Sequence, residues 1–243
     1  MNIKNKIFGL YIRIKRMASY YYNISFHPFW REKRLKPKVL GNKYGRGYFI
    51  PGLLKDDNLV YSFGIGEDIS FDLGLIKEYK STIVGFDPTP KSIQWVKDNH
   101  EIPKSFSFME YGLAKDSGSK RFYLPADSTQ VSASLTKNLG GGHIDCDFLS
   151  FEDVLNKLGH TYVDLAKIDI EGEEYNLFQD WLNRGYTPPI GQIWVEFHPE
   201  RAGYTNFSTN QFVRKLKKIS LEPARSALVK RTNHYLLVNT KYS

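Results

Sequence analysis

The chain contains a single cysteine, Cys146, so it cannot form an internal disulfide, and a zinc site built from thiolates is disfavoured. No apolar stretch approaches the roughly 18 to 20 residues that a helix needs to cross a bilayer. Internal repeats and low-complexity segments are also absent. These absences, with a length of 243 residues, favour one soluble or peripheral α/β domain with an appendage. We expect it in the cytoplasm.

Acidic residues are nearly absent from the first 50 residues, which hold twelve Lys or Arg against Glu32 alone, a net +11. Because the whole chain carries +8, the rest of it sums to −3. Apolar residues at positions 3, 7, 10, 14 and 17 recur at helical steps, with cations between them. We therefore predict a basic amphipathic N-terminal helical extension over residues 1–44. It either packs on the domain or lies peripherally on an anionic membrane surface, at the inner face of a membrane.

Residues 35–47 are rich in Lys, Gly and Pro without periodicity, so we predict a linker there and a domain over residues 45–243. Strand-like and helix-like segments then alternate, which predicts a doubly wound, mostly parallel sheet closed by an antiparallel hairpin. The predicted strands are 59–63, 82–86, 106–109, 121–124, 165–170 and 191–197, with the hairpin formed by 227–230 and 235–239. The predicted helices are 70–79, 90–99, 150–158, 173–183 and 209–219.

A nucleotide-cofactor site is indicated where the first of these strands ends in Gly64-Ile65-Gly66. A backbone without Cβ atoms lets a ligand approach closely. Asp87 follows Gly66 by 21 residues, at the end of the next strand, where a carboxylate can accept both ribose hydroxyls. The sequence therefore predicts a ribose-containing cofactor.

The third glycine of a dinucleotide turn is missing, because Ile69 occupies its position. Glu67 and Asp68, which follow the glycines, would repel a pyrophosphate and attract an ammonium group. S-adenosylmethionine is cationic and has a ribose but no phosphate. It is therefore the cofactor that we predict.

Five segments in order extend this prediction: VYSFGIGEDISFD, VGFDPTP, EYGLAKDSG, KIDIEGEEY and IWVEFHP. Through them the chain resembles the FkbM-type family of S-adenosylmethionine-dependent methyltransferases over roughly residues 45 to 240. The resemblance implies a class I methyltransferase (Rossmann-like) fold and methylation of a hydroxyl on a sugar or another natural product. It also implies cofactor-binding roles for Gly64, Gly66, Glu67, Asp68 and Asp87, with Leu113 in the adenine wall and Glu110 beside the adenine amino group. Leu113 can equally be a core residue.

Candidate catalytic groups follow the later strands. Asp169 is our first choice to face the transferred methyl group. Glu171 and Glu173 come next, at the start of a helix, where one of them can serve the helix dipole. Glu196 and His198 alternate along a strand and should share a face, which makes His198 a candidate general base oriented by Glu196, or a structural histidine.

Asp169, Glu171, Glu196 and His198 also suit a divalent cation, which we consider possible without expecting it. Tyr111, His143 and the glycine run 140–142, predicted to be a loop, are candidates for the acceptor pocket.

The leading hypothesis is O-methylation of a sugar, glycan or glycolipid-like acceptor. A nicotinamide-dependent oxidoreductase is disfavoured by Ile69. The other alternative is a non-catalytic or nucleic-acid-binding module that uses residues 1–44, although we do not expect nucleic acid as a partner.

Overall fold

The computed structural model describes residues 36–99, 101–126, 134–135, 140–226 and 233–242. The predicted amphipathic helix of the extension lies outside these residues. The chain divides into residues 1–37 and a compact unit over residues 38–243, to which the following description applies. None of the helices in the described ranges is long and apolar enough to cross a membrane.

The segment predicted to be a linker contains a strand. β1 (Lys38–Leu40) pairs antiparallel with β2 (Gly47–Phe49), so the folded unit begins before the predicted boundary at residue 45. Phe49 explains the pairing, because its fully buried ring packs edge-on against Phe71 and Tyr79. One anchored aromatic among Lys and Gly leaves no periodic signal in the sequence.

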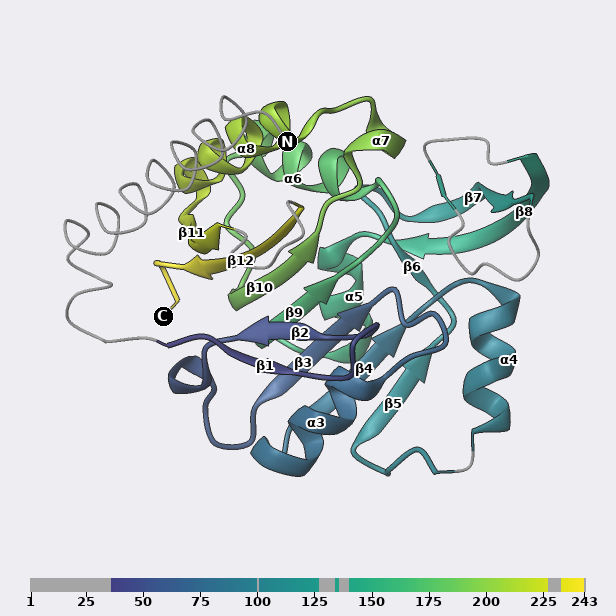
Figure 1. Ribbon diagram of the computed structural model, residues 1–243, viewed down its shortest axis with the longest axis horizontal. Helices are drawn as coiled ribbons and strands as arrows, with labels where there is room; N and C mark the ends of the chain where they lie inside the picture. Colours follow the sequence, from purple (N-terminus) through teal and green to yellow (C-terminus); the bar gives the residue numbers. More distant parts are fainter. Residues whose placement is uncertain (1–35, 100, 127–133, 136–139, 227–232, 243) are drawn as a thin grey trace, which may run out of the picture. The chain divides into compact units, whose positions relative to one another are not determined.

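A seven-stranded sheet in the order β11-β12-β10-β9-β3-β4-β5 forms the centre of the unit (Figure 1). Neighbours from β10 to β5 are parallel, whereas β12 runs antiparallel to both β10 and β11. This confirms the doubly wound, mostly parallel sheet with a closing antiparallel hairpin. The strands are β3 (Leu59–Phe63), β4 (Thr82–Phe86), β5 (Phe106–Met109), β9 (Val163–Ile168), β10 (Ile190–Glu196), β11 (Leu221–Ser226) and β12 (His234–Asn239).

The predicted position of one hairpin strand is wrong. The partner of β12 is β11, at Leu221–Ser226, and not residues 227–230, which lie outside the described ranges. Pro223 sits in β11 next to a register shift, a place where an edge strand tolerates proline. A proline inside the segment hid the strand from pattern analysis.

Local signals set the helix ends. Thr89 caps α4 and Ser150 caps α5 by accepting hydrogen bonds from backbone N–H groups, while Thr205 and Ser208 form a capping box at α8. The helices are α3 (Ser70–Tyr79), α4 (Pro90–Asp98), α5 (Phe151–Leu158), α6 (Glu174–Arg184), α7 (Pro199–Ala202) and α8 (Asn206–Lys215), with short 3-10 turns η1 (Pro51–Leu53) and η2 (Leu216–Ile219).

A second sheet contains β6 (Gly112–Leu113), β8 (Gly140–Leu149) and β7 (Gly118–Pro125), in the order β6-β8-β7. The glycine run 140–142 therefore begins a strand, and the prediction of a loop there is wrong. Phe122 and Phe148 pack edge to face across the hairpin, with ring centroids 5.4 Å apart. Figure 1 shows this sheet beyond the ends of the arrows of β9 and β10.

Candidate functional site

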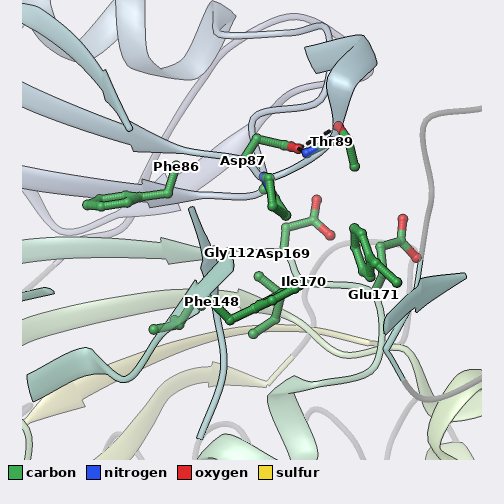
Figure 2. Close-up of a pocket in the computed structure, with 12 residues that line it drawn as sticks. Phe86, Asp87, Thr89, Gly112, Phe148, Asp169, Ile170 and Glu171 are labelled. Carbon is green, nitrogen blue, oxygen red and sulfur yellow. Dashed lines mark hydrogen bonds between the residues drawn. The ribbon is translucent and has the colours of Figure 1, made fainter. Parts of the chain in front are cut away.

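A cavity opens at the carboxyl ends of β3, β4 and β9, where a doubly wound sheet binds its ligands. Apolar and aromatic side chains make up much of its wall. Figure 2 shows Phe86 and Phe148 toward one side and the carboxylates of Asp87, Asp169 and Glu171 toward the other. The cavity is lined by Gly64, Phe86, Asp87, Pro88, Thr89, Gly112, Leu113, Phe122, Phe148, Asp169, Ile170 and Glu171.

The glycine turn lies against the end of β9. Gly64 has φ +80°, and a Cβ atom added to it would lie 1.8 Å from the carbonyl oxygen of Asp169. Its own carbonyl oxygen accepts a 2.8 Å hydrogen bond from Nζ of Lys167, a largely buried lysine on β9. Glycine is therefore required at position 64 by the close backbone packing against Asp169. The contact of Lys167 with the glycine turn was not predicted, because the sequence of an apolar strand does not show in which direction a lysine side chain points.

Asp87 is connected to the same turn. Its Oδ2 accepts a 2.9 Å hydrogen bond from the Gly66 amide, and its Oδ1 accepts from the Thr89 amide and hydroxyl at 2.9 and 2.6 Å. Burial raises the pKa of Asp87, while the hydrogen bonds from Thr89 and Gly66 oppose this rise. The hydrogen bonds to Asp87 thus connect the end of β4 to the glycine turn and to the start of α4.

Glu67, Asp68 and Glu110, which were predicted to contact the cofactor, contact other residues of the chain. In the described structure Glu67 pairs with Lys91 at 3.1 Å, and Glu110 pairs with Lys97 at 2.8 Å. Asp68 accepts hydrogen bonds from Nδ2 of Asn42 at 2.6 Å and from the amide of Ser70 at 2.7 Å. None of the three lines the cavity as described, whereas Gly64, Asp87 and Leu113 do.

Asp169, Glu171 and His198 come together beside the cavity. Nε2 of His198 lies 3.7 Å from Oδ1 of Asp169 and 3.5 Å from Oε2 of Glu171. Arg201 reaches the same Glu171 oxygen with its Nε at 2.9 Å. Glu171 has φ +56°, a strained conformation for a residue with a side chain, and Ser134 Oγ donates to its carbonyl oxygen at 2.8 Å.

Glu174, not Glu196, orients His198. Its carboxylate is fully buried and lies 3.0 Å from Nδ1 of His198. Glu196 pairs instead with Nε2 of His234 at 3.2 Å. The prediction failed because β10 ends at Glu196, so the alternation of a strand does not extend to His198. The available signal was Glu174, the third glutamate of the EGEE motif.

Glu174 also holds the turn before its own helix. The amide of Ile170 donates to its Oε1, and the amide of Gly172 donates to its Oε2, both at 2.9 Å. The neighbouring Glu173 is buried and accepts a 2.7 Å hydrogen bond from Asn176. Glu173 therefore belongs to the start of α6 and not to the cavity wall. This agrees with the alternative that one of the glutamates here serves the helix dipole.

The environment of the cluster shifts two pKa values. Burial raises the pKa of Asp169 to about 6, against the opposing charges of Lys167 and His198. Burial alone would lower the pKa of His198, but its hydrogen bond to Glu174 and the surrounding carboxylates raise it to about 10. His198 therefore carries its proton at neutral pH in this arrangement. A protonated His198 has to lose this proton before it can accept another, and its role as general base stays a prediction.

Two predicted acceptor-pocket residues are absent from the described cavity wall. Tyr111 lies under the ammonium group of Lys157, which is 5.1 Å from its ring centroid. His143 lies on β8 with its ring centroid 6.3 Å from that of Tyr123. The described part of the chain thus gives them contacts outside the cavity.

Solved structures resemble this chain only distantly. A fibrillarin pre-rRNA processing protein of Methanococcus jannaschii has a TM-score of 0.47 at 8% identity, covering 79% of this chain and 70% of that one. Fibrillarin of Aeropyrum pernix, solved with S-adenosyl-L-methionine, has a TM-score of 0.41 at 9% identity, covering 76% and 66%. Likeness at this level supports no argument about substrate. The predicted class I methyltransferase fold is confirmed by the strand order described above.

Sequence comparison is more informative. The human protein named probable methyltransferase-like protein 24 is 25% identical over 146 residues, covering 60% of this chain and 34% of its own length. This chain therefore matches about a third of that relative. The profile of a family described as a methyltransferase domain matches residues 49–233, which includes every residue of the cavity wall. The chain belongs to this methyltransferase-domain family.

Proposed function

We propose that the chain is an S-adenosylmethionine-dependent methyltransferase of the FkbM type. We further propose that it methylates a hydroxyl on a sugar, glycan or glycolipid-like acceptor. Membership of the methyltransferase-domain family supports methyl transfer as the reaction and argues against the oxidoreductase alternative. The cofactor and the acceptor class are inferred from the cavity and from the five motifs.

The cavity residues fit this cofactor. Leu113, Phe122 and Phe148 offer an apolar wall for adenine, and the carboxylate of Asp87, which also lines the cavity, suits a ribose hydroxyl. The backbone of Gly64 lines the cavity, where the methionine part of the cofactor would lie. Glu67, Asp68 and Glu110 were predicted to contact the cofactor too, and these roles stay predictions.

The observation that carries the proposed chemistry is Asp169. Its side chain lines the cavity, is about a third exposed at 32%, and has a pKa of about 6. At pH 7 such a carboxylate is mostly ionised, yet it is a stronger base than an ordinary aspartate. It is therefore suited to receive a proton at the edge of the cofactor cavity.

When bound, S-adenosylmethionine supplies a methyl group on a positively charged sulfur. The chain has to align the acceptor oxygen with that methyl group and remove the hydroxyl proton. The O–C bond forms as the C–S bond breaks with its electron pair going to sulfur. The proton passes to a carboxylate oxygen of Asp169. Proton transfer to a positioned group typically contributes about 10²- to 10⁴-fold.

Binding and turnover test separate parts of the proposal. Isothermal titration with S-adenosylmethionine should show binding that Asp87→Ala reduces at least 10-fold, since the variant loses the ribose acceptor and the link to Gly66. Asp98→Ala, at an exposed aspartate on α4, is the matched control. Equal affinity in both variants would overturn the cofactor site.

The acceptor class is tested with methyl-labelled cofactor in a cell extract. Label should enter a carbohydrate or glycolipid fraction, and Asp169→Asn should lower that transfer at least 100-fold while cofactor affinity changes little. The wild-type rate should rise with pH through about 6, as Asp169 ionises. Label recovered only in protein or nucleic acid would refute the proposed acceptor.

A further inference from the structure

We propose that Asp169, Glu171 and His198 form a binding site for a divalent cation beside the cofactor cavity. The proposal rests on the function proposed above and deepens it. The cation would hold the acceptor hydroxyl close to Asp169 and make it more acidic.

Ligand spacing supports the site. The candidate ligand atoms of the three residues all lie within 4.8 Å of one another. The distances from Nε2 of His198 to the two carboxylates are 3.7 and 3.5 Å. Ligands about 2.1 Å from a cation at tetrahedral angles are about 3.5 Å apart. A small cation therefore fits between them with little movement.

The support behind His198 is a second, independent feature. A histidine that ligates a metal through one ring nitrogen usually donates its other N–H to a carboxylate or carbonyl. Here Nδ1 faces the fully buried carboxylate of Glu174 at 3.0 Å, which leaves Nε2 directed at Asp169 and Glu171. Two backbone amides hold Glu174 in turn, so the imidazole is oriented before any cation arrives.

Local charge also suits a divalent cation. Three carboxylates face the imidazole, those of Asp169, Glu171 and Glu174, and the guanidinium of Arg201 balances one of them. Slightly farther away, Lys167 and Glu196 carry opposite charges that largely cancel. With His198 neutral and ligating, two negative charges remain for the cation to balance.

The ligand set has consequences for the reaction. One imidazole and two carboxylates leave open coordination positions, which an acceptor hydroxyl and water can fill. Oδ1 is the Asp169 oxygen that lies 3.7 Å from Nε2 of His198, so Oδ2 would be the oxygen that accepts the proton. A cation on Oδ1 would lower the basicity of this carboxylate, so proton removal would then depend on the greater acidity of the cation-bound hydroxyl.

Manganese binding tests the site without relying on activity. The full-length chain is stripped with chelator and titrated with Mn²⁺, and free Mn²⁺ is followed by electron paramagnetic resonance. Wild type should bind one Mn²⁺. Glu171→Gln removes a ligand and Glu174→Gln removes the support of His198, so each should weaken binding at least 10-fold.

Glu200→Gln is the matched control, because Glu200 is an exposed glutamate on α7 close in sequence to the cluster. It should bind Mn²⁺ like wild type. Circular dichroism and cofactor titration are run on the same samples to confirm folding. Folded wild type that binds the cofactor without binding Mn²⁺ would overturn the cation site and leave the proposed function standing. Failure of wild type to bind the cofactor would instead overturn the proposed function. Equal Mn²⁺ affinity in all three variants would also refute the site.

Discussion

Gly64→Ala tests whether the contact between the ends of β3 and β9 shapes the cofactor cavity. Gly64 has φ +80° and Gly159, at the end of α5, has φ +70°, so alanine at either position should cost about 1–2 kcal/mol of backbone strain. Nothing lies within 4 Å of a Cβ atom at Gly159. Gly159→Ala therefore measures the backbone penalty alone and serves as the control.

At Gly64 a clash adds to that penalty. The new Cβ atom would lie 1.8 Å from the carbonyl oxygen of Asp169, roughly 1.7 Å short of ordinary contact. Both partners are main chain at strand ends, so no side chain can turn away. Overpacking of this kind costs about 1–3 kcal/mol, for a total of about 2–5 kcal/mol with the backbone penalty.

Thermal unfolding and cofactor titration measure the two consequences. For a unit of this size, about 1 kcal/mol corresponds to about 2–4 °C in Tm. Gly159→Ala should lower Tm by about 2–8 °C and leave cofactor affinity unchanged, whereas Gly64→Ala should lower Tm by about 4–20 °C and weaken cofactor binding. The reasoning is refuted if the two variants have the same Tm and Gly64→Ala binds cofactor like wild type.

Three further predictions concern charge. Lys167→Met should weaken cofactor binding about 10-fold, as measured by titration, because it removes the hydrogen bond to the carbonyl of Gly64 and a buried charge beside Asp169; an unchanged affinity would contradict this role. The folded-state pKa of His198 is raised to about 10. The contribution of protonated His198 to the stability of the fold should therefore be complete below about pH 6.5 and lost as pH rises toward 10. Urea unfolding in chelator should thus show a fall in stability from pH 7 to 9.5 that His198→Gln reduces, and identical pH dependence in both proteins would argue against it. Residues 1–44 carry most of the net +11 of the N-terminal segment, so the full chain should sediment with anionic liposomes and lose this binding when residues 1–35 are deleted; binding to RNA but not liposomes would favour the nucleic-acid alternative.

Local sequence determined much of the scaffold. The segments 59–63, 70–79, 82–86 and 106–109 were predicted with the bounds that the structure has. Continuous apolar runs identify strands buried on both faces, and capping residues identify helix starts. Gly64, Asp87, Leu113 and Asp169 all line the cavity, because a parallel sheet brings the carboxyl ends of its strands to one edge, and their predicted roles stay predictions.

Side-chain partners distant in sequence decided the rest. Glu67, Asp68 and Glu110 follow the predicted strand ends and contact Lys91, Asn42 and Lys97 there, and none of the three lines the described cavity. Glu174 reaches His198 because β10 ends before the histidine and α6 begins beneath it. The pairing of β7 with β8 adds Phe122 and Phe148 to the cavity wall. The glycines at the start of β8 gave no sequence signal for this strand.

The physical reason for this division is the range of the forces involved. Backbone conformation depends mainly on neighbouring residues and on burial pattern, which the sequence displays directly. The direction of a charged side chain depends on which opposite charge or amide the fold brings within about 3 Å. The sequence by itself therefore determined a cofactor-binding α/β sheet, and only the tertiary structure decided which carboxylates surround His198 and Asp169.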